Sequence, residues 1–590
     1  MNRPTGMRKT SMQTSKLALA AVIGTTISFT PVTHVSAEEE FSFEEITTAE
    51  LTEGYQNGEF TAEEVVQAYM DRIQTYEETY NAFTFLNENA LEEARAIDQK
   101  REAGEEVGEL AGIPIVIKEA VDVEGFPTTF GWAPLSKEAG GIELQPTADA
   151  PIVEDLKDSG AIIMGKTNIP AFSASGTNAS SSWAGDTYNV VDPNLAPGGS
   201  SSGTAASVSG NFAVLGIAEE TGGSIQNPAA AQSLVGIKPT FGLVPTTGVT
   251  PLAGSTRDVL GPHARSVEDA AVMLDVIAGY EAEDPKTSAS VGKMPEEGYG
   301  ADLDDTSLEG KRIGLYGQSW RGEALSDETK ELYDQAVEEL ESQGAEVVED
   351  PFADTGFADF TEEAGNVGYD AFVYDVNNYL QNLDPEDPTM NINDVFEEAG
   401  EVPWTEDGEL GFLIERGVDI DSTLEEPNTP PDQEEFEEVK AEYLEKITEV
   451  MENQNLDGFV YPQMSEEIPP LDDQEANIEA TTVPEINISG LPLVTVPAGY
   501  YDSGSPFALS FFGEQWTEES LINMAYDYEQ ATNHRETPEL MVAENGAEGG
   551  ELPETASHAP AYIMGGLLLS GMGALCLLPR YRRKSSMTNE

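Results

Sequence analysis

The stretch that most constrains this chain, residues 196–239, is rich in glycine and serine. Two turns of small residues, 198–203 and 221–224, flank an apolar segment at 212–218. Glycine lets the backbone approach a ligand closely because it has no Cβ, and free N–H groups in such turns can surround an anion or a developing oxyanion. Apolar residues and prolines interrupt the small residues, which argues against a flexible linker. The stretch therefore predicts a folded site whose serines are candidate nucleophiles.

Helices and short apolar strands alternate over much of the chain. The region 42–105 has apolar residues three to four positions apart, with Thr61 as a plausible N-cap, and predicts helices. Residues 112–118 predict a buried strand that ends in Lys118. This alternation is typical of an α/β sheet. Further strands are predicted at 161–164, 312–316, 345–348, 456–462 and 507–512, and further helices at 151–156, 266–279, 327–343 and 518–533.

The charge of the chain is extremely negative. The sequence has 29 Lys and Arg against 109 Asp and Glu, a formal net charge of −80. Such a surface repels nucleic acid and anionic membranes, and it suggests adaptation to high salt, where screening relieves repulsion between like charges. The single cysteine, Cys576, excludes an internal disulfide.

The glycine and serine turns resemble the signature of the amidase signature family. The first turn (198–203), the second turn with its continuation (221–229) and the segment 236–239 match the family pattern in order. Ser202 stands where the family usually has Gly, and Gln226 stands where many members have Arg, which leaves the substrate subgroup open. The resemblance covers residues 42 to about 535. It implies an α/β fold with a central mixed β-sheet covered by helices on both faces.

Two residue types compete for the role of general base. Of the four histidines, His263 and His534 lie within the region of resemblance, and neither sits in a turn of small residues. A lysine at the end of a buried strand loses solvation, so its neutral form becomes accessible near neutral pH. Lys118 has this position, although an ordinary salt bridge to Glu119 or Asp122 is the alternative interpretation.

The family resemblance implies specific roles. Lys118 becomes the base, Ser224 the nucleophile, and Ser200 the bridging serine that follows a cis Gly199–Ser200 peptide bond. The resemblance also implies an oxyanion hole and a set of residues near the substrate. The predicted oxyanion donors are the N–H groups of Thr221, Gly222, Gly223 and Ser224, and the predicted substrate contacts are Ser175, Gly176 and Gln226. We expect no cofactor and no metal, since no His and Cys cluster has the spacing of metal ligands.

The two ends of the chain carry targeting patterns. Residues 1–37 have a basic start, a short apolar run and a small-residue cleavage site, as in a secretory signal peptide. After an acidic linker (536–551), residues 552–590 resemble a Gram-positive cell-wall sorting signal, with an apolar segment at 561–578 and a basic tail. This order predicts cleavage by a sortase between Thr555 and Ala556 and attachment to peptidoglycan, with a plain membrane anchor as the alternative.

These observations predict a secreted amidase domain at 38–535, with the acidic region 350–435 as a variable insertion near the substrate entrance. The expected reaction is hydrolysis of a small-molecule or peptide amide to the acid and ammonia or an amine, through a serine acyl-enzyme. An esterase of the same fold and a catalytically inactive, wall-displayed binding protein are the alternatives. An amidotransferase component shares the signature, but a secreted chain would meet no charged tRNA.

Overall fold

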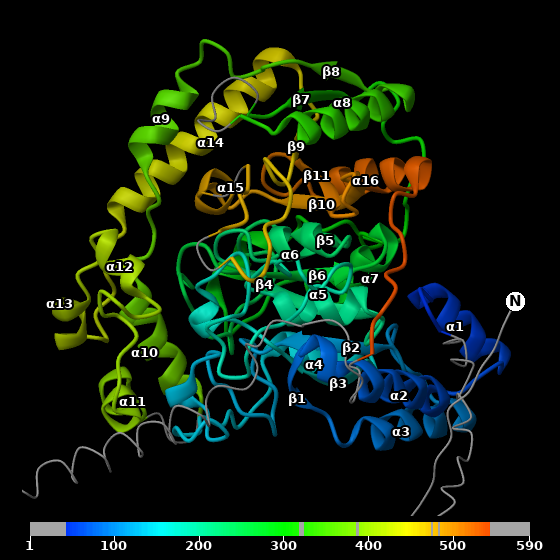
Figure 1. The fold of residues 1–590 in the computed structure, drawn as a ribbon, viewed down its shortest axis with the longest axis vertical. Helices are drawn as coiled ribbons and strands as arrows, with labels where there is room; N and C mark the ends of the chain where they lie inside the picture. Colours follow the sequence, from blue (N-terminus) through cyan, green and yellow to red (C-terminus); the bar gives the residue numbers. More distant parts are fainter. Residues whose placement is uncertain (1–42, 318–323, 385–388, 474–475, 482–483, 543–590) are drawn as a thin grey trace, which may run out of the picture. The chain divides into compact units, whose positions relative to one another are not determined.

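The computed structural model describes residues 43–542 apart from 318–323, 385–388, 474–475 and 482–483. Residues 43–590 form one of two compact units. The centre of this unit is an 11-stranded sheet in the order β1-β3-β2-β4-β6-β5-β10-β11-β9-β7-β8 (Figure 1). The strands are β1 (Phe83–Leu86), β2 (Pro114–Lys118), β3 (Ile162–Thr167), β4 (Leu215–Glu220), β5 (Val235–Lys238), β6 (Val259–Ala264), β7 (Arg312–Leu315), β8 (Glu346–Val348), β9 (Gly458–Pro462), β10 (Leu493–Tyr500) and β11 (Pro506–Phe512).

The sheet is mixed. Strand β2 runs parallel to both β3 and β4, and β7 runs parallel to both β8 and β9, while the other pairs are antiparallel. Strands β2, β4 and β6 are buried along their whole length, because helices cover them. Most predicted strands are confirmed, whereas β1 and β6 were not predicted: β1 is short, and Gly261 and Pro262 disguise β6 as a loop.

Helices pack on this sheet in two groups. In one group α5 contacts α6, and these two lie against β2, β4, β5 and β10; in the other, α7 contacts both α4 and α16, and α16 contacts α8. The predicted α/β fold, a mixed sheet flanked by helices, is confirmed. The helices are α1 (Thr48–Asn57), α2 (Ala62–Tyr80), α3 (Ala90–Ala103), α4 (Pro151–Asp158), α5 (Ser202–Ser209), α6 (Gln226–Ala231), α7 (Val267–Ile277), α8 (Asp327–Ser342), α9 (Phe357–Ala364), α10 (Phe372–Asn382), α11 (Ile392–Ala399), α12 (Gly411–Glu415), α13 (Ile420–Glu425), α14 (Glu434–Gln454), α15 (Pro484–Ser489) and α16 (Glu518–Thr532).

Local sequence signals set several of these boundaries. Thr61 caps α2 as predicted: its side chain accepts a hydrogen bond from Glu64 N–H, and the Glu64 carboxylate accepts from Thr61 N–H. Helix α5 has only buried residues and lies on the sheet so closely that a Cβ on Gly203 would stand 2.2 Å from Ala82 O. The small residues of this stretch are therefore required by packing as well as by the turns.

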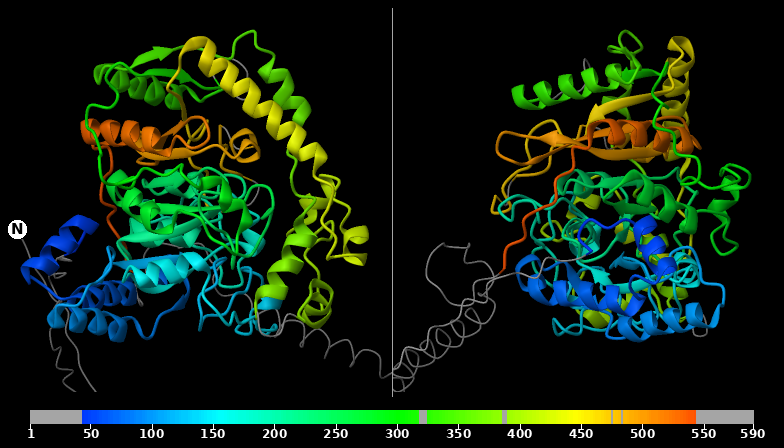
Figure 2. Two further views of the ribbon diagram at one scale, coloured as in Figure 1. Left: turned by 180° about the vertical axis from the view of Figure 1, so that it is seen from behind. Right: turned by 90° about the vertical axis from the view of Figure 1, so that its right-hand side faces the viewer.

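The acidic region 350–435 is helical, which its sequence pattern did not predict. Its acidic side chains face outward, while apolar residues of α10 and α11 join a cluster with Phe130, Trp132 and Phe172. The Trp132 and Phe396 rings are 5.7 Å apart, and those of Phe130 and Tyr379 are 5.5 Å apart. Figures 1 and 2 show α9 to α14 running along one side of this unit. These helices need the cluster to bury their apolar face, so local sequence alone did not reveal them.

Several predicted segments lie outside the described residues: the signal peptide, most of the acidic linker, the sorting signal with its apolar segment, and the cleavage site at Thr555 and Ala556. Among the helices of the described ranges, none is both long and apolar enough to cross a membrane.

Candidate active site

The candidate site forms where two parallel neighbours, β2 and β4, end at the same edge of the sheet. Strand β2 ends in Lys118, and β4 ends in Glu219 and Glu220, directly before the second small-residue turn. The carboxyl ends of parallel strands are a common place for ligand sites in α/β proteins. The topology thus brings Lys118 beside a turn that lies about a hundred residues later in the sequence.

Lys118 is fully buried and makes three polar contacts. Its Nζ lies 2.6 Å from Ser200 Oγ and donates to the backbone oxygen of Glu219 (2.9 Å) and to the Glu219 carboxylate (Oε2, 2.6 Å). Burial lowers the pKa of Lys118, and the negative charge of Glu219 opposes that effect. The ion-pair partner of Lys118 is therefore Glu219, and neither Glu119 nor Asp122, the two candidates from the sequence, pairs with it.

The turn that carries Ser200 is held by the loop at Ser175 and Gly176. The Gly199–Ser200 peptide bond is cis, as the family resemblance implied. Gly199 N–H donates to Gly176 O (2.9 Å), and a Cβ on Gly199 would stand 2.5 Å from Ser175 O. The half-buried Ser175 side chain accepts from the N–H groups of Thr177 and Asn178. Ser175 and Gly176 thus lie directly against the serine turn.

The second turn presents Ser224 together with free backbone donors. Gly223 has a φ of +102°, a conformation that favours glycine, and Ser224 is 5% exposed. Within the described part of the chain, the N–H groups of Gly222, Gly223 and Ser224 donate to no protein acceptor. These donors are therefore available to a developing oxyanion.

Glu220 anchors the residues that come after Ser224. Its Oε2 accepts from Ile225 N–H (2.8 Å) and Gln226 N–H (3.2 Å), and its Oε1 accepts from the amides of Gln226 (2.5 Å) and Asn487 (2.7 Å). Tyr461 donates its hydroxyl to Gln226 Oε1 (3.0 Å). Gln226 is fully buried, and its amide is used within the protein on both sides. Its placement gives it a role in holding the turn, with no polar atom left to reach a substrate.

Thr221 connects the site to a second buried carboxyl group. Its Oγ1 lies 2.6 Å from Asp258 Oδ1 and 3.2 Å from Glu219 Oε1. Burial raises the pKa of Asp258 to about 7, and the charge of Glu219 adds to that effect. Glu219 and Asp258 were not predicted as site residues. The pair of acids that ends an apolar strand at 219–220 was the available signal.

The two candidate histidines have other roles. His263 lies in β6, fully buried, with Nε2 2.9 Å from Ile225 O, and burial lowers its pKa to about 4. His534 comes after α16, and its Nε2 lies 2.9 Å from Glu339 Oε2. Neither histidine contacts Ser200 or Ser224, so the geometry favours Lys118 over histidine as the base.

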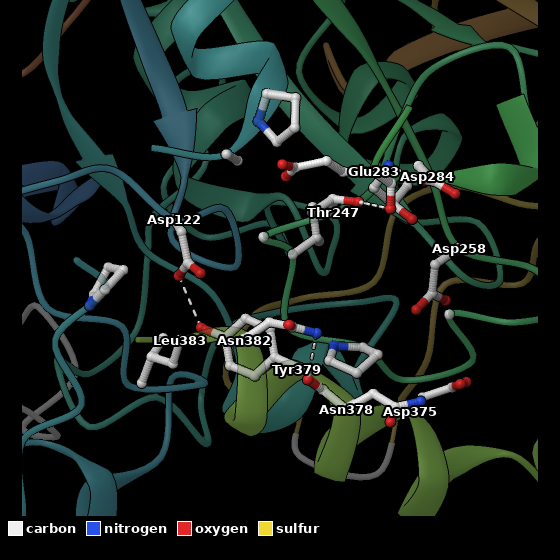
Figure 3. Close-up of a pocket in the computed structure, with 18 of the residues that line it drawn as sticks. Asp122, Thr247, Asp258, Glu283, Asp284, Asp375, Asn378, Tyr379, Asn382 and Leu383 are labelled. Carbon is white, nitrogen blue, oxygen red and sulfur yellow. Dashed lines mark hydrogen bonds between the residues drawn. The ribbon is translucent and has the colours of Figure 1, made fainter. Parts of the chain in front are cut away.

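A pocket of about 730 Å³ borders this site and is acidic (Figure 3). Lys118, Ser200 and Ser224 do not line it, and it meets their network only at Asp258. Across the pocket, Tyr379 donates its hydroxyl to Asp122 Oδ1 (2.8 Å), as Figure 3 shows. No group of three or more His, Cys, Asp or Glu in the described ranges is arranged to hold a metal ion. The acidic lining residues are Asp122, Asp149, Asp258, Glu283, Asp284 and Asp375, with Lys286 as the basic one.

A buried lysine against a serine that follows a cis bond, beside a glycine turn with a second serine, defines an amide-bond hydrolase, and comparison with known proteins agrees. The family model named Amidase matches residues 64–522, and the chain belongs to this family. A glutamyl-tRNA(Gln) amidotransferase component from Trichormus variabilis, the one that this enzyme's nomenclature designates by the letter A, is 33% identical over 471 residues, covering 77% of this chain and 91% of that protein.

Solved structures of amidases are similar over nearly their whole length. The peptide amidase from Stenotrophomonas maltophilia has 31% identity and a TM-score of 0.66, covering 85% of this chain and 99% of that one. An amidase family protein from Bacillus anthracis has 28% identity and a TM-score of 0.64, covering 84% and 92%. Membership of the amidase family and hydrolase activity on amide C–N bonds are thereby shown.

The predicted localisation is wrong. The curated relatives are named for a reaction on a charged tRNA, a molecule found inside cells, which contradicts secretion and attachment to a cell wall. The predicted sortase and peptidoglycan partners have no support either, and the residues that suggested them lie outside the described ranges. The end segments were judged by local composition alone, which carries less information than a match over 471 residues.

Proposed function

We propose that this chain hydrolyses a carboxylic amide through an acyl-enzyme on Ser224, with Ser200 and Lys118 as the proton relay. The observation that supports this most is the 2.6 Å contact between Lys118 Nζ and Ser200 Oγ in a fully buried setting. A buried amine next to a hydroxyl is poised to accept its proton, because burial favours the neutral amine.

The reaction has two halves. Neutral Lys118 accepts the Ser200 hydroxyl proton while Ser200 accepts that of Ser224, and Ser224 Oγ bonds to the amide carbon. The free N–H groups at Gly222, Gly223 and Ser224 stabilise the oxyanion, with Thr221 N–H as a further predicted donor. The proton returns by the same relay to the leaving nitrogen as the C–N bond breaks. Water then attacks the acyl-enzyme, and the relay carries its proton back to Ser224.

The substrate class has two candidates. Similarity to the peptide amidase supports a peptide amide or a small amide, with Ser175 and Gly176 as predicted contacts because they lie against the serine turn. Similarity to the glutamyl-tRNA(Gln) amidotransferase component supports a second candidate, in which the ammonia released is passed to partner chains. An ester substrate would undergo the same acyl chemistry.

A substrate panel with ammonia detection tests the proposal. The panel contains peptide C-terminal amides, glutamine, asparagine and an aryl ester, each at low and high salt. We expect amide hydrolysis by the wild type, an acyl-enzyme visible by mass spectrometry, and neither in Ser224→Ala. Ser207→Ala is the matched control, since Ser207 is a buried serine of α5 whose hydroxyl has no partner within the described residues. Equal rates in Ser224→Ala and the wild type would refute the assignment of the nucleophile, and a folded wild type inactive on the whole panel would favour the binding-protein alternative.

A further inference from the structure

The contacts of Lys118 match the hydrogen-bonding capacity of a neutral amine. A lysine ammonium has three N–H donors and no acceptor, whereas the neutral amine has two N–H donors and one lone pair. Two of the three contacts go to oxygens of Glu219, one on the backbone and one on the carboxylate. With both N–H groups held there, the lone pair points at Ser200 Oγ, 2.6 Å away.

A second proton count concerns Thr221. Its single hydroxyl lies between two carboxyl groups, 2.6 Å from Asp258 Oδ1 and 3.2 Å from Glu219 Oε1. One hydroxyl proton can be donated to only one of them. Both contacts are hydrogen bonds when Asp258 carries a proton, donates it to Thr221, and Thr221 donates to Glu219. The other oxygen of Asp258 accepts from the N–H groups of Leu252 and Ala253, so it needs no further donor.

From these two counts we infer that Glu219 is a positioning residue that orients Lys118 and sets its basicity, and that Asp258 supports Glu219 in its protonated form. This inference rests on the proposed function, because it assigns a role to Glu219 only if Lys118 is the base. The ionised carboxylate of Glu219 stabilises the lysine ammonium that forms during acylation. Its backbone oxygen keeps the amine turned toward Ser200 in both charge states.

The charges around the network are consistent with this assignment. Three groups besides Lys118 are ionisable at the edge of β4 and β6: Glu219, Glu220 and Asp258. Glu220 is held by four donors of its own, and His263 on β6 is neutral at pH 7 because burial lowers its pKa to about 4. Ionisation of both Glu219 and Asp258 beside an ammonium would bury three charges, whereas a neutral lysine with protonated Asp258 buries one, and each buried charge is costly.

The test is the pH profile of kcat/KM for ammonia release. Glu219→Gln keeps the shape of the side chain and removes its charge. We expect the acidic limb of its profile to move to lower pH by about one unit or more, since the ammonium loses its anion, and the plateau to fall about tenfold or more, since a weaker base transfers the proton more slowly. Asp375→Asn is the matched control: Asp375 is another buried carboxyl of the same pocket, bonded to Ser255, and its profile should equal that of the wild type.

Two further variants keep the inference open to refutation if Glu219→Gln does not fold. Glu219→Asp retains the charge, so its limb should stay near the wild-type position although its rate falls. Asp258→Asn mimics the protonated acid, so its limb should coincide with that of the wild type below pH 7; a downward shift would show that Asp258 acts as an anion and overturn its assignment. A merely structural role for Glu219 predicts a lower plateau with an unmoved limb. That result, with Ser224→Ala and Lys118→Met inactive, overturns this inference and leaves the proposed function standing, whereas an active Lys118→Met removes the proposed base itself.

Discussion

Replacing Lys118 by methionine separates the stability of the site from its chemistry. The substitution keeps the apolar stem and leaves the Glu219 carboxylate, 1% exposed, without its cation. Removing one partner of a buried ion pair typically costs about 3–5 kcal/mol, because the other charge remains buried and uncompensated. The double variant Lys118→Met, Glu219→Gln removes both charges, so most of that loss should be recovered. Both variants should lack amide hydrolysis, because both lack the base.

The pH dependence gives this prediction a sign. In Lys118→Met the folded-state pKa of Glu219 rises above its unfolded value of about 4.3, so the deficit is small below that pH and grows as pH rises through the folded-state pKa, by about 1.4 kcal/mol per unit. Melting temperatures of wild type, single and double variants at pH 5 and pH 8 measure it. We expect the single variant to lose several degrees at pH 8, less at pH 5, and the double variant to regain them. A single variant as stable as the wild type at pH 8 would refute the reasoning.

Three other perturbations have expected outcomes. Gly223→Ala should lower ammonia release more than tenfold, about 1.4 kcal/mol of barrier or more, because its φ is +102° and its Cβ would stand 3.0 Å from Asn227 Nδ2; Gly125→Ala, with φ +91° and open space, is the control. His263→Gln should reduce the loss of melting temperature between pH 7 and pH 5, because a buried histidine with a pKa of about 4 gives stability that is present above its unfolded pKa of about 6.5 and lost as pH falls. With 109 acidic against 29 basic residues, melting temperature should rise between about 0.01 M and 1 M NaCl, as the Debye length falls from about 30 Å to about 3 Å; a flat series would exclude adaptation to salt.

Much of the sheet and the family could be predicted from sequence because their signals are local. A buried strand has the pattern of a short apolar run, as in β2, and a capped helix has a periodic pattern after a Thr, as in α2. The order of turn, strand and turn at 196–239 was enough for the amidase resemblance. The helices of the acidic region escaped because their apolar face is defined only by contact with Phe130, Trp132 and Phe172.

The sequence by itself determined the pieces of the site: a lysine at the end of a buried strand and two turns of glycine and serine. Only the tertiary structure decided which groups face one another. The partner of Lys118 is Glu219, about a hundred residues away and not the adjacent Glu119, because parallel pairing of β2 and β4 places their carboxyl ends together. Asp258 joins through Thr221 because β6 begins where β4 ends. Charge partners across a sheet are set by strand order, and strand order is a property of the whole packed chain that no local pattern encodes.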